Sequence, residues 1–172
     1  MNSSLNGLSA WIALGADAAQ QATADAVELP ERGLAALVLV DSHPSCSVDW
    51  LFHRLGITQS GTVRLLDRLQ TSELIVRTRQ PGRREVDVTI TAAGRRVLAR
   101  GLAARSRALE DLLAPLAAHE REVLTGLIRK ALSHRGRSRG DADTLCRLCD
   151  WSACGEACPV DASVASTTDE AG

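Results

Sequence analysis

The chain has 172 residues and a formal net charge of −1, and a length of this order is typical of one domain with an appendage. Apolar residues make up 45% of the sequence but aromatic residues only 2%, so the core must consist of Leu, Ala and Val, which favours helices over sheets. No stretch reaches the roughly 18 consecutive apolar residues of a membrane span. No basic residue precedes Arg32, which argues against a secretory signal. We therefore expect a cytoplasmic, mainly helical protein with no membrane partner.

The charge is distributed unevenly along the chain. Residues 1–30 carry three acidic residues and no basic one, and residues 140–172 carry seven acidic residues and one basic one. Between them, residues 92–139 carry eleven basic and four acidic residues. A basic middle between acidic ends indicates a polyanionic partner.

Two prolines mark the ends of the first two predicted helices. An Ala/Leu-rich stretch over residues 5–28 predicts a helix that ends before Pro30. The apolar run over residues 31–43 predicts a second helix, which ends at Pro44.

The next two predicted helices are shorter and carry typical capping residues. Ser47 can cap a short helix that Gly56 ends. Thr58 can cap the following helix, which spans Gln59 to Glu73. The segment "LGIT" between them is short enough to make a tight turn.

The pattern then changes from helical to alternating. Residues 74–79 and 85–91 alternate between apolar and polar side chains, and "QPGRR" between them is a turn signal, so the pair predicts a β-hairpin with a basic tip. Helical patterns return over residues 92–114 and 117–135. The fold class predicted is therefore mainly α with a small β component (α+β).

The helix from Gln59 to Glu73 has two different faces on a helical wheel. One face comprises Thr62, Leu65, Leu66 and Leu69, and the other comprises Ser60, Val63, Arg64, Asp67 and Arg68. The apolar face can pack on the preceding helix, which leaves the polar face free to enter a major groove of DNA. The predicted DNA contacts on this helix are Thr58, Gln59, Ser60, Val63, Arg64 and Arg68.

The hairpin adds a second predicted contact with DNA. Arg79, Arg83 and Arg84 lie at or beside its tip, where guanidinium groups suit a narrow minor groove and its phosphates. Each arginine by itself could belong to a solvated charged face. The order of helix, tight turn, capped helix and basic hairpin is more specific, and it predicts a winged helix-turn-helix that binds DNA.

Two segments carry a resemblance to a known family. "LGITQSGTVRLLDRLQTSELIVR" and "RREVDVTITAAGRRVL" resemble the MarR family of winged-helix regulators, in which an Asp-Arg-Leu ending of the recognition helix is followed by an Arg-rich wing and a Leu-Thr-x-x-Gly return. Ile90 stands in for the leucine of that return. The resemblance is clearest over residues 30–100 and implies a homodimer, with long helices interlocked at both ends and two wings reaching a palindromic operator. Relatives bind phenolic or carboxylate effectors in a cleft that Trp11 could face.

The helices beyond the hairpin carry apolar residues at helical spacing, which is consistent with such a dimer. These residues are Leu98, Leu102, Leu109, Leu112 and Leu113 in one helix, and Val123, Leu124, Leu127, Ile128 and Leu132 in the next. A monomer would leave such a pair half exposed, so mutual burial across a two-fold axis is expected.

Four of the five cysteines lie close together near the end of the chain. Cys146, Cys149, Cys154 and Cys158 have the spacing C-x2-C-x4-C-x3-C, which in a cytoplasmic chain indicates metal ligation rather than disulfides. Zinc suits four converging thiolates. An iron–sulfur cluster suits thiolates spread around a larger core, and C-x3-C-P is the ending of a ferredoxin-type run. We prefer iron–sulfur because a tail outside the fold is better placed as a sensor than as a brace.

The domain boundaries follow from these elements. We expect an N-terminal dimerisation helix (1–29), a DNA-binding domain (30–91), C-terminal dimerisation helices (92–135), and a segment comprising a polar linker, the four-cysteine motif and a disordered tail (136–172). The linker "GRSRGDAD" would transmit changes at the cysteines poorly, because a flexible tether carries little force.

The combined prediction is a homodimeric, sequence-specific transcriptional regulator, in the first instance a repressor. Its affinity for double-stranded DNA would be tuned by the four-cysteine site or by a small-molecule effector. The alternative is a helical dimeric interaction protein whose zinc knuckle recruits a partner. No catalytic serine–histidine–aspartate set, phosphate loop or paired-carboxylate site is visible in the sequence, so an enzyme is not expected.

Overall fold

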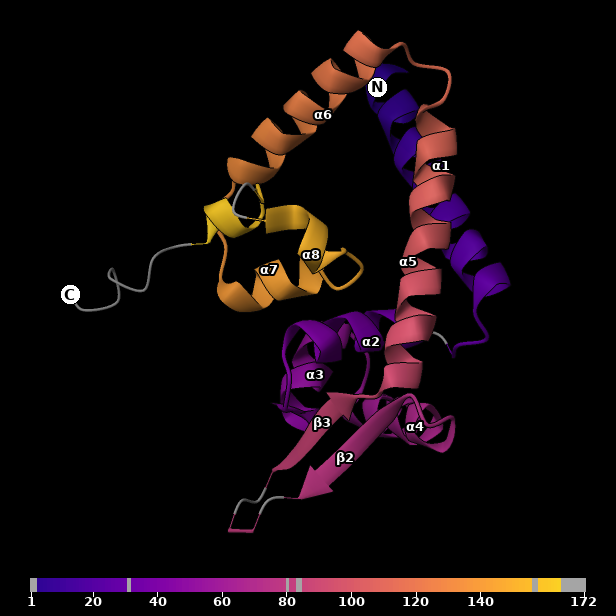
Figure 1. Cartoon of the computed structure of the whole chain (residues 1–172). Helices are drawn as coiled ribbons and strands as arrows, with labels where there is room; N and C mark the ends of the chain where they lie inside the picture. The colour runs from indigo at the N-terminus through magenta and orange to yellow at the C-terminus, as the bar shows by residue number, and fades with distance from the viewer. Residues whose placement is uncertain (1–2, 31, 80, 83–84, 156–157, 165–172) are drawn as a thin grey trace, which may run out of the picture.

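A computed structural model describes residues 3–30, 32–79, 81–82, 85–155 and 158–164. Its helices are α1 (Ser3–Ala26), α2 (Gly33–Ser42), α3 (Val48–Leu55), α4 (Gln59–Thr71), α5 (Ala92–Leu113), α6 (Ala118–Ser133), α7 (Arg139–Leu145) and α8 (Trp151–Cys154), followed by the 3-10 helix η2 (Asp161–Ser163). Its strands are β1 (Cys46–Ser47), β2 (Ile75–Arg79) and β3 (Val86–Ile90). The mainly helical α+β winged-helix class is confirmed (Figure 1). No helix in these residues is both long enough and apolar enough to cross a bilayer.

The sheet is antiparallel and has the strand order β1-β3-β2. The predicted hairpin is present, with Ile75 opposite Ile90 and Arg79 opposite Val86. The third strand was not predicted from the sequence: Cys46 pairs with Val88, and two residues are too few to show an alternating pattern.

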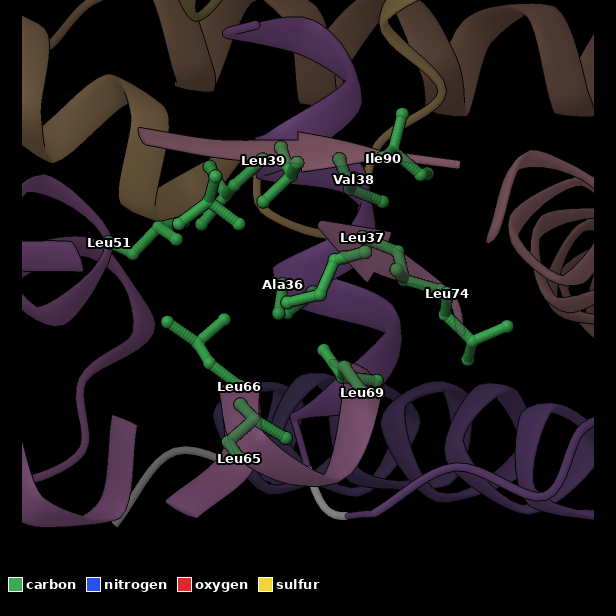
Figure 2. Close-up of a cluster of buried hydrophobic side chains, with 14 of the residues drawn as sticks. Ala36, Leu37, Val38, Leu39, Leu51, Leu65, Leu66, Leu69, Leu74 and Ile90 are labelled. Carbon is green, nitrogen blue, oxygen red and sulfur yellow. The ribbon is translucent and has the colours of Figure 1, made fainter. Parts of the chain in front are cut away.

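The core of the DNA-binding domain surrounds α2. Every residue from Gly33 to Val40 is buried, and Figure 2 shows this helix among side chains from α3, α4 and the sheet. Leu51, Leu55 and Leu66 are completely buried in the same cluster. Because α2 is apolar on all sides, it fills the space between the other elements and fixes the position of α4 against them.

The predicted caps are present. The Ser47 hydroxyl accepts a hydrogen bond from the Trp50 backbone N–H at 3.1 Å, and Thr58 accepts one from the Gly61 N–H at 3.1 Å. Gly56 ends α3 with a positive φ of 66°, a conformation that favours glycine. The tight turn before α4 is therefore encoded in the sequence at both of its ends.

The long helices α1 and α5 pack side by side, and α6 turns back from the end of α5 toward the DNA-binding domain (Figure 1). None of the described residues of α6 is buried. Among the exposed apolar side chains are Leu8 and Ile12 in α1 and Val123, Leu127 and Ile128 in α6.

The linker prediction for residues 136–143 was wrong, because most of this segment is helical. Ser138 accepts a hydrogen bond from the Asp141 N–H at 3.1 Å and caps α7, and Ala142 and Asp143 are buried. Residues 159–164 are also ordered: they include η2, and Val164 bridges to Arg137. The remainder of the predicted disordered tail, residues 165–172, lies outside the described residues.

Candidate DNA-binding surface, thiol cavity and arginine pocket

The two faces of α4 are those expected from the helical wheel. Thr62, Leu65, Leu66 and Leu69 are buried, whereas Thr58, Gln59, Ser60, Val63, Arg64 and Arg68 are exposed. The buried face packs into the core around α2. The structure therefore brings the predicted DNA contacts of this helix together on one exposed surface; their contact with DNA remains a prediction.

The exposed arginines of this surface are not neutralised by the protein. In the described residues, Arg64 and Arg68 of α4 and Arg79 of β2 form no ion pair. The predicted wing contacts Arg83 and Arg84 lie outside those residues. A guanidinium without a carboxylate partner can bind a phosphate or a guanine edge without first breaking an ion pair.

A polar contact joins α4 to the wing. Arg77 of β2 forms an ion pair with Asp67 and donates a hydrogen bond to the side-chain oxygen of Gln70. This contact fixes the recognition helix relative to the hairpin, so both predicted contacts with DNA move as one unit.

All four clustered cysteines line one cavity of about 220 Å³, which we call the thiol cavity. A hydrogen bond between Cys146 and Cys149 raises the pKa of Cys146 and lowers the pKa of Cys149 to about 6, and Arg105 also favours the Cys149 thiolate. Burial, followed by the nearby Cys158, raises the pKa of Cys154. The backbone N–H of Asp161 points at the sulfur of Cys158 at 3.5 Å.

The four thiols line this cavity, but they are not arranged as the ligands of one metal ion. No group of three His, Cys, Asp or Glu side chains in the described residues has an arrangement that could hold a metal ion. The donor set nevertheless suits a thiophilic metal, because it provides four sulfurs and a backbone N–H donor to one of them. Metal binding would therefore require the side chains to move closer together.

The fifth cysteine is in a different environment. Cys46 is buried in the core of the DNA-binding domain, and burial raises the pKa of its thiol to about 11. A thiol with a raised pKa reacts slowly, so Cys46 is a packing residue rather than a reactive thiol.

The segment that carries the thiols packs against α3. Asp143 in α7 is buried and accepts a hydrogen bond from Nε of Arg54 in α3 at 2.8 Å. The ring of His43 lies 4.4 Å from that of Trp50 and 4.9 Å from that of Trp151. Burial lowers the pKa of His43, and the nearby Asp143 only partly opposes this effect. Residues 139–155, which we call the thiol segment, therefore pack against the predicted DNA-binding domain.

A second, larger cavity of about 770 Å³ lies between α1, α2 and α5. Trp11, Leu109 and Leu112 contribute to its apolar wall, and its charged lining residues are Arg32, Arg105 and Arg147, with no acidic residue among those described. We call it the arginine pocket. Nε of Arg147 is buried and has no hydrogen-bond partner. The pocket can therefore accept a molecule with an apolar body and an anionic group.

Comparison with known proteins identifies the winged helix. Residues 32–84 match the MarR family model. This part of the chain, which includes the winged helix, is therefore similar to the MarR family. A probable transcriptional regulator from Pseudomonas aeruginosa is 29% identical, with a TM-score of 0.51, and the match covers 67% of this chain and 91% of that one.

Two further structures share the MarR fold at lower identity. A MarR family protein from Bacillus stearothermophilus is 23% identical with a TM-score of 0.64, over 76% of this chain and 95% of that one. A MarR family protein from Mycobacterium tuberculosis, in complex with p-aminosalicylic acid, is 21% identical with a TM-score of 0.59, over 72% and 94%. No curated protein matches the sequence significantly. Together these structures show that the chain has the fold of MarR family proteins.

The MarR model ends well before the thiol segment, and sequence reasoning missed the residues that dock it. Arg54 and Asp143 are 89 positions apart, so no local pattern joins them. Arg147 lies inside the cysteine motif, and its sequence position alone did not indicate that it lines a pocket. The basic and apolar lining of the arginine pocket comes from four separate segments of the chain, and only Trp11 was named as a candidate.

Proposed function

We propose that this protein is a homodimeric repressor that binds a palindromic operator through α4 and the wing. The observation that carries the proposal is the exposed face of α4. There Arg64 and Arg68 have no acidic partner among the described residues, and the buried side chains of Thr62, Leu65 and Leu66 hold the helix against the core. A rigid helix with unpaired arginines can read base edges with little loss of side-chain freedom.

The dimer is supported by the apolar side chains that the single chain leaves exposed. Leu8 and Ile12 of α1 and Val123, Leu127 and Ile128 of α6 are between 39% and 60% exposed. Exposed apolar groups on two long helices are typical of an interface. A second copy of the chain would bury them and would place two α4 helices on one duplex.

DNA binding is tested by titrating the protein against fragments of the DNA upstream of its own gene, at two salt concentrations. We expect preference for one short palindrome to persist as total affinity falls with salt. Arg64→Ala should weaken operator binding by about 1–3 kcal/mol. The control is Arg107→Ala, which removes an exposed arginine of α5. Equal affinity of the two variants for the operator would contradict the proposal.

Repression is tested separately by transcription from the same promoter in vitro. Addition of the protein should reduce transcript from the operator-bearing template and leave a template with a scrambled palindrome unaffected. An increase in transcript would indicate an activator that uses the same DNA-binding surface.

The second part of the proposal is a metal site at Cys146, Cys149, Cys154 and Cys158, which holds zinc or an iron–sulfur cluster. It is supported by the shared cavity and by the lowered pKa of Cys149, since metals bind the thiolate form. Bound metal would supply a fixed link between the two halves of the cysteine motif. Iron, sulfide and zinc are measured in protein purified without oxygen, with Cys154→Ser as the comparison. The absence of all three would contradict the proposal.

The third part is an effector site for a small carboxylate in the arginine pocket. Support comes from its volume of about 770 Å³ and from its three arginines. A structurally similar protein from Mycobacterium tuberculosis is a complex with p-aminosalicylic acid, a molecule with the carboxylate and apolar ring that this lining suits. Binding is tested by calorimetric titration with p-aminosalicylate and, as a control, with aniline, which lacks the carboxylate.

A further inference from the structure

The arginine pocket and the thiol cavity share one turn of the chain. Cys146 and Cys149 line the thiol cavity, while the two residues between them, Arg147 and Leu148, line the arginine pocket. The C-x2-C spacing therefore does more than place two thiols: it places a cation on the opposite side of the same turn.

Three hydrogen bonds hold this turn. The Cys149 N–H donates to the Cys146 carbonyl at 2.9 Å, and the same carbonyl accepts a hydrogen bond from Nε1 of Trp151 at 3.0 Å. The Cys146 N–H donates to the carbonyl of Ala142 at 2.9 Å. Because the turn is tied at these points, a backbone movement that brings Cys146 and Cys149 toward Cys154 and Cys158 would also move Arg147.

Arg147 is poorly satisfied in the present arrangement. Its Nη1 donates to the carbonyl of Thr144, but its buried Nε has no hydrogen-bond partner among the residues that the structure describes. Arg32 lies close enough to repel it, and no described carboxylate lines the pocket. A bound carboxylate would pair with this guanidinium and reduce the repulsion between the two cations.

We propose that the four-cysteine site and the arginine pocket are two coupled halves of one sensor, in which the thiol ligands set the position of Arg147 and Arg147 binds the anionic group of an apolar carboxylate. The inference rests on the metal site and the effector pocket proposed above. Coupling of this kind is reciprocal, so metal binding and carboxylate binding change each other's affinity by the same factor.

The coupling is tested by calorimetric titration of p-aminosalicylate into the full chain in two states, loaded with Zn²⁺ and stripped with a chelator. We expect the two dissociation constants to differ by about fivefold or more. The converse titration, Zn²⁺ into protein with and without p-aminosalicylate, should give the same factor. Equal dissociation constants for p-aminosalicylate in the two states would overturn the proposal.

Two variants distinguish coupling from simple charge attraction. Arg147→Met should weaken p-aminosalicylate binding by about tenfold and abolish its dependence on Zn²⁺. Arg32→Met removes a pocket cation that lies outside the cysteine motif; it should change the affinity and retain the Zn²⁺ dependence. The control Arg107→Met, in α5 and outside the pocket, should bind as wild type. If Arg147→Met keeps the wild-type affinity or the wild-type Zn²⁺ dependence, the proposal is wrong.

Failure of this inference can be separated from failure of the proposed function. Measured zinc and iron contents show whether the metal site exists, and operator affinity shows whether the protein is a DNA-binding regulator. Protein that holds metal, binds its operator and binds p-aminosalicylate equally in both metal states would refute only the coupling.

Discussion

Arg54 and Asp143 join the DNA-binding domain to the thiol segment: Nε of Arg54 lies 2.8 Å from Oδ2 of Asp143. Arg54 is in the last turn of α3, just before the tight turn that leads to α4. Asp143 also lines the thiol cavity. Asp143 and Arg54 therefore connect the thiol cavity to α3, the helix that precedes α4.

The ion pair should contribute measurably to stability. Asp143→Asn leaves Arg54 without its carboxylate partner, and since the Asp143 side chain is only 1% exposed, we expect a loss of about 2–3 kcal/mol in the free energy of unfolding. Urea denaturation followed by tryptophan fluorescence measures it. The control is Asp161→Asn, which breaks the exposed pair with Arg139 at 2.7 Å and should cost under about 1 kcal/mol. Similar losses in both variants would show that burial of the first pair does not matter.

His43 should make this docking sensitive to acid. Its pKa is lowered by burial between Trp50 and Trp151, so the folded state favours the neutral ring. The stabilisation is present above the ordinary value of 6.5 and is lost as the pH falls through the lower folded-state pKa. Wild-type protein should therefore lose more stability than His43→Gln between neutral pH and pH values below 6.5.

The same urea titrations, repeated over this pH range, check the effect. His134→Gln removes an exposed imidazole at the end of α6 and serves as the control. A constant stability difference between wild type and His43→Gln at every pH would contradict the assigned role of this ring.

The sequence predicted best those features that depend on residues close together in the chain. Ser47 predicted the start of α3, and Gly56 and Thr58 predicted the turn before α4, because capping needs one side chain or one positive φ within a few residues. The wing was predicted because alternation over five residues is a local signal. The polar face of α4 followed from helical spacing alone.

The docking of the thiol segment was not predicted, because it depends on residues far apart in the chain. The composition of residues 136–143 is also typical of a linker and not of a helix. Gly136, Gly140 and the neighbouring polar residues predicted a linker, yet Ser138 caps a helix there and Asp143 finds Arg54 across the fold. The helix α2 is apolar on all sides, so its sequence did not predict which of its faces packs against which element. Tertiary contacts, and not local propensity, decide both regions.

Gly94 should be indispensable for the connection between the wing and α5. A Cβ at this position would lie 2.2 Å from the carbonyl oxygen of Leu74 and 2.7 Å from a side-chain carbon of Ile90, so the backbone would have to move. We expect Gly94→Ala to reduce the free energy of unfolding by about 2–3 kcal/mol. Gly7→Ala in α1 meets no atom within 4 Å and should instead stabilise by about 0.5–1 kcal/mol.

Thermal or urea denaturation of the two variants decides this prediction. Opposite signs are expected, since both changes add one methyl group to a helix and differ only in the space around it. A neutral Gly94→Ala variant would contradict the close approach of Gly94 to the Leu74 carbonyl.

The apolar face of α6 should hold the dimer together. Leu127 is 60% exposed in the single chain, so Leu127→Glu would place a carboxylate in the proposed interface, where it would be buried without a partner. We expect sedimentation velocity to show monomer in place of dimer at micromolar concentration, with a loss of operator affinity because the two α4 helices no longer bind as a unit. Thr125→Glu adds the same charge at an exposed position of α6 whose hydroxyl bonds only within the helix, and it should remain dimeric. A dimeric Leu127→Glu protein would place the interface elsewhere, and the exposed leucines of α1 would become the next residues to test.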